Sequence, residues 1–425
     1  MHKLSFVSLA AALAAVGGAA SAQIDPNLVQ ATPQPAVPAG EVAPAPVAPA
    51  PVAPPVAPPV IEWNKADAQD LLTYIEGIGE EGLDPADYDP ARLRSAISGK
   101  SKDELSVVAS ELFLRVSSDL ALGHVRGDAR NNWYINDPDL NGNDQYSMMQ
   151  RAVKNHSVRD TLTALLPTHP QYGELKAVLA DMPKTEKAKI EKIRTNMDRW
   201  RWLPRDLGQK YVIVNVPAYM VALVEDGRVV ARRRAVAGAV KTATPSLNAT
   251  ISGVIFNPWW EVPKSIEPEV RGKKGYVAVK DESGKVVRYR QPPGAGNALG
   301  KMKLVMPNNH AIFLHDTNAK GLFDKQARAY SHGCIRTEDA LGFAGVLLEP
   351  TGQWDQAKIK ETIASGKSVQ ANLAAPIPVY ITYFTAAAIA DKRDVIAYSD
   401  IYSRDKTVVA ALNDRSGTTA LASAK

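Results

Sequence analysis

The spacing of the hydrophobic residues in this 425-residue chain changes beyond Trp202, and this change limits the fold more than any other feature. Between residue 65 and about Met182 they recur at three- and four-residue steps, as in AQDLLTYIEGI and KDELSVVASELFLRVSSDLAL, which predicts amphipathic helices. Asp89-Pro90 and Ser101 have the residue types that start helices. A charged segment, Lys184–Trp202, is a further predicted helix. Beyond it the spacing becomes two, which is typical of β-strands.

The two-residue spacing first appears in YVIVNV, at 211–216, and continues through a hairpin that turns at Glu225-Asp226-Gly227. We expect further strands near 251–256, 276–281, 303–306, 311–315 and 377–384, and helices over Glu338–Leu348 and Gln356–Ser365. The fold class is therefore α+β, with a helical N-terminal scaffold domain followed by a β-rich domain.

The N-terminus has the layout of a secretory signal peptide. His2 and Lys3 precede the apolar run Leu4–Val16, and Ala20-Ser21-Ala22 is a small-x-small cleavage site. An uncleaved membrane anchor is the alternative, but the many Ala, Gly and Ser residues of this segment make a poor spanning helix. We expect cleavage after Ala22 and an exported mature protein, with membrane contact only through the transient signal peptide.

Composition divides the rest of the chain. Thr32–Pro59 is almost all Pro, Ala and Val, which predicts an extended spacer, and its composition alone carries no recognition code. The expected organisation is a signal peptide (1–22), a Pro/Ala-rich disordered linker (23–61), a helical scaffold domain (62–183), a catalytic domain (184–412) and a C-terminal tail (413–425).

Several function classes are excluded by the residue counts. A single cysteine rules out an internal disulfide framework and multi-cysteine metal sites, and seven scattered histidines form no metal-ligand pair. His124, His156 and His169 are isolated and are interpreted as structural. The net charge of +5 suits an anionic polymer, but no nucleic-acid motif is present. Gly294-Ala295-Gly296 is a poor phosphate loop, so we expect no cofactor.

The chemistry-bearing residues lie in one stretch around Cys334. His315 and His332 are two imidazoles that can activate a thiolate, and Gly333 allows a tight turn with backbone amides open to a substrate oxygen. We interpret Thr337 as a helix N-cap, so that the nearby helix terminus and Arg336 lower the pKa of Cys334. The alternative is a buried, inert cysteine in a helix-capping turn.

His315, fifteen intervening residues and then Ser331-His332-Gly333-Cys334 resemble the H-x(14–17)-[S/T]-H-G-C signature of L,D-transpeptidases with a YkuD-type catalytic domain. The resemblance runs from about Met197 to Leu412. It is supported by the segments NMDRWRWLP (196–204), FNPWWEVPKSI (256–266), RQPPGAGNALG (290–300) and VYITYFTA (379–386), which are similar to the large periplasmic YcbB-type branch.

The resemblance implies a reaction and a place for it. A periplasmic enzyme of this family takes a peptidoglycan tetrapeptide stem as acyl donor, releases D-alanine, and passes the acyl group to the side-chain amine of a second stem in a 3→3 cross-link. Cys334 would be the nucleophile and His315 the proton acceptor and donor, oriented by a backbone carbonyl and not by the Asp316 carboxylate. Gly333 and Cys334 would supply oxyanion amides, and His332 would support the turn.

Substrate-binding residues are assigned more loosely. Arg336 would pair with a stem carboxylate or brace the loop. Trp260 and Phe313 would form pocket walls, with core packing as the alternative for Trp260, and Arg290 and Gln291 would line the same cleft.

Two departures from the YcbB-type pattern are visible. No peptidoglycan-binding module fits between Met182 and Asn196, so wall targeting would come from the cleft, the scaffold, the charge or a periplasmic wall-synthesis protein. The lid-like insertion, at 266–293, is shortened but keeps a glycine-containing hairpin at Asp281–Lys285.

The acceptor stays open at this point. Water, a D-amino acid or a wall-attached protein in place of a second stem would make an L,D-carboxypeptidase, an exchange enzyme or an attachment enzyme. A non-catalytic wall-binding factor is a third class, and the intact spacing of His315 and Cys334 argues against it. Reaction of Cys334 with a carbapenem would separate the catalytic readings from this one.

Overall fold

The computed structural model describes residues 61–389 and 392–414, which lie in one compact unit of the chain, Ala57–Lys425. The expected signal peptide, nearly all of the expected linker and most of the expected tail lie outside the described residues. Among the helices of the described part, none is both long enough and apolar enough to cross a bilayer.

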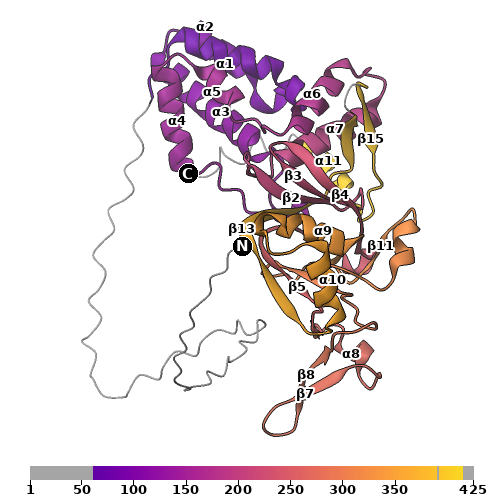
Figure 1. Cartoon of the computed structure of the whole chain (residues 1–425). Helices are drawn as coiled ribbons and strands as arrows, with labels where there is room; N and C mark the ends of the chain where they lie inside the picture. The colour runs from indigo at the N-terminus through magenta and orange to yellow at the C-terminus, as the bar shows by residue number, and fades with distance from the viewer. Residues whose placement is uncertain (1–60, 390–391, 415–425) are drawn as a thin grey trace, which may run out of the picture. The chain divides into compact units, whose positions relative to one another are not determined.

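The first part of the described chain is helical, as the spacing predicts, and is drawn in indigo to magenta in Figure 1. Its helices are α1 (Lys65–Gly77), α2 (Pro90–Ser98), α3 (Lys102–Leu122), α4 (Gly142–Lys154), α5 (Val158–Thr163) and α6 (Pro170–Asp181), with short 3₁₀ turns η1 (Ile78–Glu81), η2 (Pro85–Tyr88) and η3 (Gly127–Arg130). The two predicted helix starts are confirmed, because Asp89 and Ser101 accept hydrogen bonds from the amides of Arg92 and Glu104.

The apolar faces of α1–α5 meet in one core, which includes the buried Leu71, Leu112 and Phe113, whereas α6 packs with α7 (Lys187–Trp200) in a second core. The three isolated histidines have structural partners. His124 contacts Asp119 at 2.8 Å, His156 contacts Asp67 at 3.0 Å, and His169 caps α6. Each therefore has a local bonding role in the helical region.

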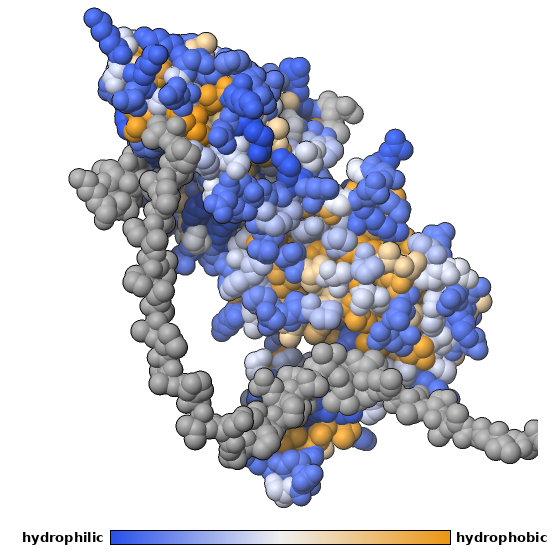
Figure 2. Space-filling view, turned by 90° about the vertical axis from the view of Figure 1, so that its left-hand side faces the viewer, coloured by the Kyte–Doolittle hydropathy of each residue, from blue (hydrophilic) through white to orange (hydrophobic). Residues whose placement is uncertain are grey.

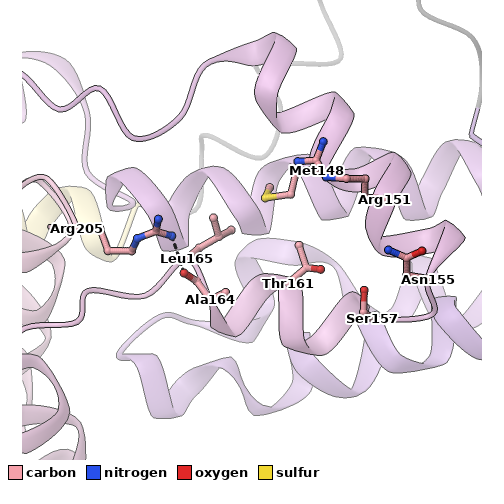
Figure 3. A pocket seen from close by; sticks show the side chains of 8 residues that line it. All are labelled: Met148, Arg151, Asn155, Ser157, Thr161, Ala164, Leu165 and Arg205. Atoms are coloured by element: carbon pink, nitrogen blue, oxygen red, sulfur yellow. Dashed lines mark hydrogen bonds between the residues drawn. The ribbon is translucent and has the colours of Figure 1, made fainter.

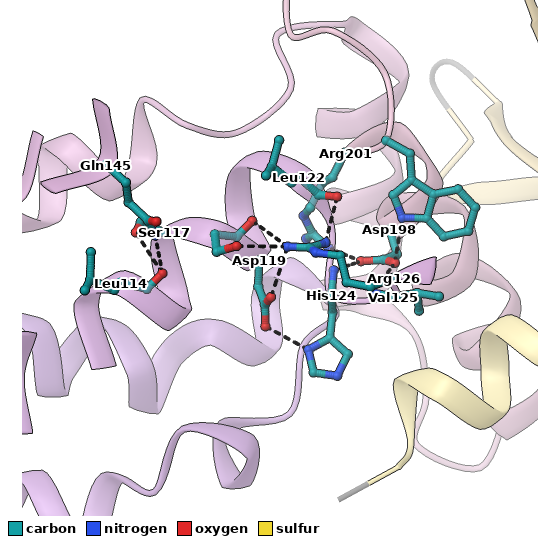
Figure 4. Close-up of polar contacts among 12 residues, drawn as sticks. Leu114, Ser117, Asp119, Leu122, His124, Val125, Arg126, Gln145, Asp198 and Arg201 are labelled. Atoms are coloured by element: carbon teal, nitrogen blue, oxygen red, sulfur yellow. Dashed lines mark hydrogen bonds and ion pairs between the residues drawn. The ribbon is translucent and has the colours of Figure 1, made fainter. Parts of the chain in front are cut away.

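The predicted charged helix is α7 (Lys187–Trp200), and it anchors the helical region through one buried carboxylate. Asp198 accepts hydrogen bonds from the amides of His124 (2.7 Å) and Val125 (3.1 Å) and from the indole N–H of Trp202 (2.9 Å) (Figure 4). A buried carboxylate stays stable only when it is well bonded, so Asp198 fixes the loop after α3 against α7. Only five residues separate α6 from α7, and no peptidoglycan-binding module lies between them.

The second part is built on a ten-stranded sheet with the order β1-β5-β13-β2-β3-β4-β12-β10-β9 and with β11 beside β4. Since β9 also pairs with β5, the sheet closes on itself. The strands are β1 (Trp133–Tyr134), β2 (Lys210–Asn215), β3 (Met220–Glu225), β4 (Arg228–Gly238), β5 (Ser246–Phe256), β9 (Met302–Val305), β10 (Leu314–His315), β11 (Ala329–Ser331), β12 (Ile335–Thr337) and β13 (Val369–Thr382).

The predicted hairpin at Asp226-Gly227 is confirmed, and both residues have positive φ, as the tight turn between β3 and β4 requires. Helices α9 (Ala340–Leu348) and α10 (Gln356–Ala364) and the turns η4 (Val240–Thr242), η5 (Lys320–Asp324) and η6 (Glu349–Thr351) complete this part. Alternate residues of the strands, such as Leu314 and Ile335, pack with α9 in the core. The strand residues between these core positions point to the opposite face of the sheet.

The remaining strands and helices lie outside the ten-stranded sheet. β6 (Trp260–Glu261), β8 (Val286–Gln291) and β7 (Val277–Lys280) form a separate three-stranded sheet, and α8 (Glu267–Val270) precedes β7. This is the segment that the sequence predicts as a shortened lid, and its hairpin turns at Asp281–Lys285 as expected. β14 (Ala386–Ile389) pairs with β15 (Asp394–Ala397), and α11 (Asp405–Leu412) is the last described helix.

Candidate active site

Cys334 lies in a tight turn between β11 and β12 that is closed by its own side chains. The hydroxyl of Ser331 donates to the carbonyl oxygen of Cys334 at 2.5 Å and accepts from the amide of Gly333 at 3.1 Å. Gly333 has a φ of +118°, and a Cβ there would lie 3.1 Å from Ile312 Cδ1. The turn therefore needs glycine at position 333 for both its conformation and its space.

Two threonines hold this turn through hydrogen bonds to its backbone carbonyl groups. Thr244 Oγ1 donates to the carbonyl of Gly333 at 2.8 Å and accepts from the amide of Gly238 at 2.9 Å. Thr242 Oγ1 donates to the carbonyl of Ser331 at 2.9 Å. Sequence reasoning missed both threonines, because a single hydroxyl residue in a loop gives no local signal of a contact 89 residues away.

His315 is buried at the end of β10, with 5% of its surface exposed. Its Nδ1 lies 2.5 Å from the backbone oxygen of Asp316. A carbonyl oxygen can only accept, so Nδ1 carries the hydrogen and Nε2 is left as the basic nitrogen. Burial lowers the pKa of His315 to about 4, and the positive charge of Arg336 adds to the effect, while the bond to Asp316 opposes it. The imidazole is neutral at neutral pH.

The histidine and the cysteine come together because β10 and β12 are parallel neighbours. Leu314 pairs with Ile335, and His315 pairs with Arg336. Since side chains alternate along a strand, the core pair Leu314 and Ile335 leaves Cys334, Arg336 and His315 on the other face of the sheet. The two ends of the sequence motif therefore meet on adjacent strands.

The predicted lowering of the Cys334 pKa is wrong. Burial raises the pKa of the thiol, although the backbone of Phe313 and the charges of Arg336 and Lys303 act in the opposite direction. The half-buried Sγ lies 3.6 Å from the carbonyl oxygen of Ala311, which is an acceptor and therefore suits the S–H form. The raised pKa therefore favours the thiol form of Cys334 at neutral pH.

The predicted helix cap at Thr337 is also wrong. Thr337 belongs to β12 and pairs with Ala235 of β4. The cap is Asp339, whose side chain accepts from the amide of Gly342 at 3.2 Å, and α9 begins at Ala340. The helix terminus is therefore separated from Cys334 by a whole strand, which removes the dipole argument for a low pKa.

Lys303 is a site residue that sequence reasoning missed. It lies on β9, directly across from His315, and its ammonium group is 5.3 Å from the ring centre of Phe313. Burial lowers the pKa of Lys303, and the charges of Glu261 and Cys334 act in the opposite direction. Lys303, His315 and Arg336 thus form one row across three strands, which no sequence spacing reveals.

Arg336 stands half-buried in this row without a partner. None of its guanidinium nitrogens has a hydrogen bond or an ion pair within residues 61–389 and 392–414, and its Nε is fully covered. Burial lowers the pKa of Arg336, and the Cys334 thiolate would oppose that effect. An unpaired guanidinium beside the cysteine has a fork of donors available for a planar anion such as a carboxylate.

Asp316 has a structural role that leaves its carboxylate away from catalysis. Its Oδ2 accepts from the amide of Lys301 at 2.8 Å, and its Oδ1 forms an ion pair with Lys320. Gly300 makes room for this carboxylate, since a Cβ there would lie 2.4 Å from Asp316 Oδ2. It is the backbone oxygen of Asp316 that contacts His315, in line with the role that the family resemblance implies.

The two expected oxyanion amides differ in whether they already donate a hydrogen bond within the protein. The amide of Gly333 already donates to Ser331 Oγ, whereas the amide of Cys334 has no acceptor in the described part of the chain. The structure therefore favours the Cys334 amide over the Gly333 amide as an oxyanion donor. His332 Nε2 lies 3.4 Å from Glu269 Oε1 in α8, and the imidazole is half exposed. His332 thus connects the cysteine turn to the hairpin segment.

The remaining predicted substrate residues lie at the base of the hairpin. Arg290 forms an ion pair with Glu261 at 3.0 Å and stacks over Trp259 at 4.1 Å. Trp260 is half-buried and lies beside Tyr276 at 6.2 Å. Figure 2 shows apolar residues at the hairpin end of the molecule, where Val277, Val286 and Val287 are exposed.

Gln291, which the sequence assigns to the cleft, has its side-chain amide bonded to the loop that follows it. It is buried, its Nε2 donates to the carbonyl of Gly296 at 2.9 Å, and its Oε1 accepts from the amide of Ala298 at 2.9 Å. With both ends of its amide bonded to the following loop, Gln291 braces that loop. Local sequence could not reveal this closure over five to seven residues.

A separate pocket of about 350 Å³ lies in the helical region (Figure 3). Met148 and Arg151 of α4 line one wall, and Thr161 lies opposite on α5. It includes none of the residues that the sequence analysis assigns to chemistry, and Arg205 at its rim is bonded to the carbonyl of Ala164.

Two family models match parts of this chain. Residues 209–367 match the family model of the L,D-transpeptidase catalytic domain, YkuD, and residues 62–179 match the family model of the Scaffold domain. This chain carries a YkuD-type L,D-transpeptidase catalytic domain. The helical region before it is a Scaffold domain, and the β-rich YkuD domain follows it as the α+β expectation states.

Individual L,D-transpeptidases show how far the likeness extends. The curated Haemophilus influenzae protein named "Putative L,D-transpeptidase" is 28% identical over 293 residues, which are 63% of this chain and 59% of that protein. An L,D-transpeptidase structure from Mycobacterium smegmatis is 12% identical and has a TM-score of 0.23, covering 41% of this chain and 58% of that one. The catalytic domain of an Enterococcus faecium L,D-transpeptidase acylated by ertapenem is 15% identical, with a TM-score of 0.19 and coverage of 41% and 98%.

Proposed function

We propose that this protein is a periplasmic peptidoglycan L,D-transpeptidase that forms 3→3 cross-links through a thioester on Cys334. The observation that supports the proposal is the register of β10 and β12, in which His315 and Arg336 are paired residues and Cys334 lies two positions before Arg336, while His315 Nδ1 is bound to a backbone oxygen. The match of residues 209–367 to the L,D-transpeptidase catalytic domain supports the reaction class.

The first half of the reaction forms the thioester. His315 Nε2 takes the proton of the Cys334 thiol as Sγ bonds to the carbonyl carbon of the third stem residue. The bond from that carbon to the nitrogen of D-alanine then breaks, and the imidazolium returns the proton to the leaving amine. A neutral thiol beside a neutral imidazole suits this order, because the proton moves during the attack and not before it.

The second half passes the acyl group on. The side-chain amine of an acceptor stem attacks the thioester carbon, its proton passes to His315, and the C–S bond breaks to give an amide and the Cys334 thiol. In both halves the backbone N–H of Cys334 would donate a hydrogen bond to the negative oxygen of the tetrahedral intermediate. Lys303 and Arg336 would lower the energy of the thiolate that leaves in this step.

Arg336 would bind a carboxylate of the donor stem. The proposal rests on its position, half-buried in the row that contains His315, and on the lack of any bonded partner within the described residues. Arg290 and Trp260 are placed at the base of the hairpin, where a small lid would contact the substrate, and Phe313 would form a wall beside Lys303.

Mass spectrometry of products tests the proposal. The mature protein and the Cys334→Ala variant would be incubated with a disaccharide-tetrapeptide. A cross-linked dimer that lacks one D-alanine, formed only by the wild type, is the expected result. Formation of the tripeptide product without the cross-linked dimer would instead indicate an L,D-carboxypeptidase. Absence of both products, together with a Cys334 that a carbapenem leaves unmodified, would overturn the enzyme proposal.

A further inference from the structure

The loop between β9 and β10 is built on the side chain of Asn308. Its Oδ1 accepts from the amides of His310 at 3.1 Å and Ile312 at 3.2 Å, and its Nδ2 donates to the carbonyls of Met306 and Ile312, both at 2.8 Å. A side-chain amide has two donor hydrogens and an acceptor oxygen with two lone pairs. All four bonding positions of Asn308 are therefore used within this loop.

The loop directs two backbone groups at the catalytic sulfur. Asn308 binds both the N–H and the C=O of Ile312, and adjacent peptide groups of an extended chain point to opposite edges. The groups on the opposite edge are the Ala311 carbonyl and the Phe313 N–H, and both contact Cys334. Sγ lies 3.6 Å from the Ala311 oxygen, and a hydrogen bond from the Phe313 backbone N–H lowers the pKa of the thiol.

Ala311 has an unfavourable backbone conformation that the loop must hold in place. Its φ is +51°, in the left-handed region that residues with a Cβ rarely adopt. Such a conformation persists only where the surrounding structure imposes it. The amide of Ala311 donates to the Asn308 carbonyl at 3.3 Å, and the residue that follows Ala311 is bound by the Asn308 side chain. Asn308 therefore supplies the bonds that keep the Ala311 carbonyl beside the sulfur.

The two backbone groups suit different protonation states of Cys334. A carbonyl oxygen only accepts, so the Ala311 carbonyl binds the S–H of the thiol, and a thiol is a weak donor. A backbone N–H only donates, and its bond to a negatively charged sulfur is charge-assisted and stronger. The Phe313 amide has no oxygen acceptor in the described part of the chain, so it is available to the sulfur. On balance the pair favours the thiolate and opposes the effect of burial.

We propose that Asn308 is a positioning residue for the Cys334 sulfur. Through the loop that it organises, Asn308 keeps the Ala311 carbonyl on the resting thiol and the Phe313 N–H ready for a charged sulfur. In the proposed reaction that charge develops twice. It develops as His315 takes the thiol proton, and again as the sulfur leaves with the electron pair of the C–S bond and takes a proton back from the imidazolium. These two steps rest on the proposed function, whereas the contacts around the sulfur do not.

The rate of alkylation of Cys334 by iodoacetamide, measured against pH in the full-length protein, tests the proposal. We expect Asn308→Ala to move the midpoint of this profile to higher pH, because the N–H that stabilises the thiolate is no longer held. Acylation by a carbapenem should slow about tenfold in the same variant. The matched control is Asn309→Ala, which changes the exposed neighbouring asparagine and should keep the parental profile. Asn308→Ser keeps a hydroxyl that replaces the amide only in part, so its midpoint should lie between the two.

A purely structural role for Asn308 predicts the opposite shift. Burial raises the pKa of Cys334, so a variant that only loosens the loop and exposes the sulfur should be alkylated faster, with its midpoint at lower pH. A lower or unchanged midpoint in Asn308→Ala would therefore overturn the proposal. If Asn308→Ala does not fold, the direction of the shift in Asn308→Ser decides in the same way.

The failure of this proposal and that of the proposed function are distinguishable. Alkylation of Cys334 by iodoacetamide requires no transpeptidase turnover. A parent protein that a carbapenem leaves unmodified would count against the catalytic proposal, and the alkylation profiles of the Asn308 variants would still decide whether this residue positions the sulfur.

Discussion

His315 and Arg336 are paired residues on adjacent parallel strands, and the guanidinium of Arg336 helps to keep the imidazole neutral. The same arginine has no bonded partner within the described residues. An arginine that lowers the pKa of the proposed general base and has no other bonded partner suits the proposed binding of an anionic ligand.

Substitution of Arg336 should therefore damage activity without loss of stability. We expect Arg336→Met to reduce kcat/KM for stem acylation by about 10- to 100-fold, as the loss of a charge-assisted hydrogen bond would. The midpoint of urea unfolding should stay the same or rise, because no native ion pair is broken. Arg336→Lys keeps the charge but loses the fork, so only partial activity should return. A large fall in stability would mean that the arginine braces the loop.

The buried, neutral His315 should make stability depend on pH. Its pKa of about 4 in the folded protein lies below the ordinary value near 6.5, so the unfolded chain binds the proton more tightly. Stability should fall as the pH drops from about 6.5 to about 4, by roughly 3 kcal/mol for this group. Urea unfolding at a series of pH values would measure this. His315→Asn should reduce the slope in that window, where His169, whose pKa burial also lowers to about 4, contributes the same dependence. An unchanged slope would contradict a buried neutral His315.

Lys303 should tune the thiol through its charge. We expect Lys303→Met to raise the apparent pKa of Cys334, seen as an alkaline shift in the rate of alkylation by iodoacetamide. Lys303→Arg should restore much of the wild-type profile. Lys301→Met removes an exposed lysine two residues away and serves as the control. Equal profiles for Lys303→Met and Lys301→Met would remove Lys303 from the site.

Thr244 should matter through its hydroxyl alone. Its Oγ1 bridges the carbonyl of Gly333 and the amide of Gly238, both buried, so Thr244→Ala leaves two polar groups unpaired. We expect a loss of about 1–3 kcal/mol in the free energy of unfolding and slower acylation of Cys334 by a carbapenem. Thr244→Ser keeps the hydroxyl and should stay close to wild type in both measurements.

Gly300 should tolerate no side chain, because of the carboxylate of Asp316. A Cβ at Gly300, where φ is +64°, would lie 2.4 Å from Asp316 Oδ2. Gly272 has a similar φ of +74° but nothing within 4 Å of a Cβ. In both alanine variants the positive φ should lower the free energy of unfolding by about 1 kcal/mol. The difference between Gly300→Ala and Gly272→Ala therefore measures the steric clash at Gly300 alone. We expect Gly300→Ala to be less stable by a further 2 kcal/mol or so.

Local patterns predicted what depends on neighbours in the sequence. The hairpin at Asp226-Gly227, the helix starts at Asp89 and Ser101, and most strand positions follow from spacing and turn chemistry. The pairing of Cys334 with His315 could be expected only from the family motif, since nothing in the chain itself indicates that β10 and β12 are parallel neighbours. The roles of both residues stay predictions until the variants are measured.

The failures have one physical cause, which is tertiary contact. Thr337 has a good capping side chain, but its pairing with Ala235 in the sheet takes precedence over the helix. Arg336 does act on Cys334 as expected, yet burial has the larger effect on the thiol. Lys303 became a neighbour of the site only through the antiparallel register of β9 and β10. None of these contacts leaves a trace in local spacing.

The Scaffold region lends a strand to the sheet that carries the site. Trp133 and Tyr134 of β1 pair with Ser246 and Leu247 of β5, and Trp133 lies edge-on to Trp202 at 5.0 Å. A chain cut at residue 184 would thus leave β5 with a bare edge, a surface on which other strands aggregate. The boundary between the two family matches is therefore not a place where the chain can be divided without loss. Fusing the YkuD half to another protein would require a substitute for Trp133 and Tyr134, which lie more than a hundred positions before their partners in β5.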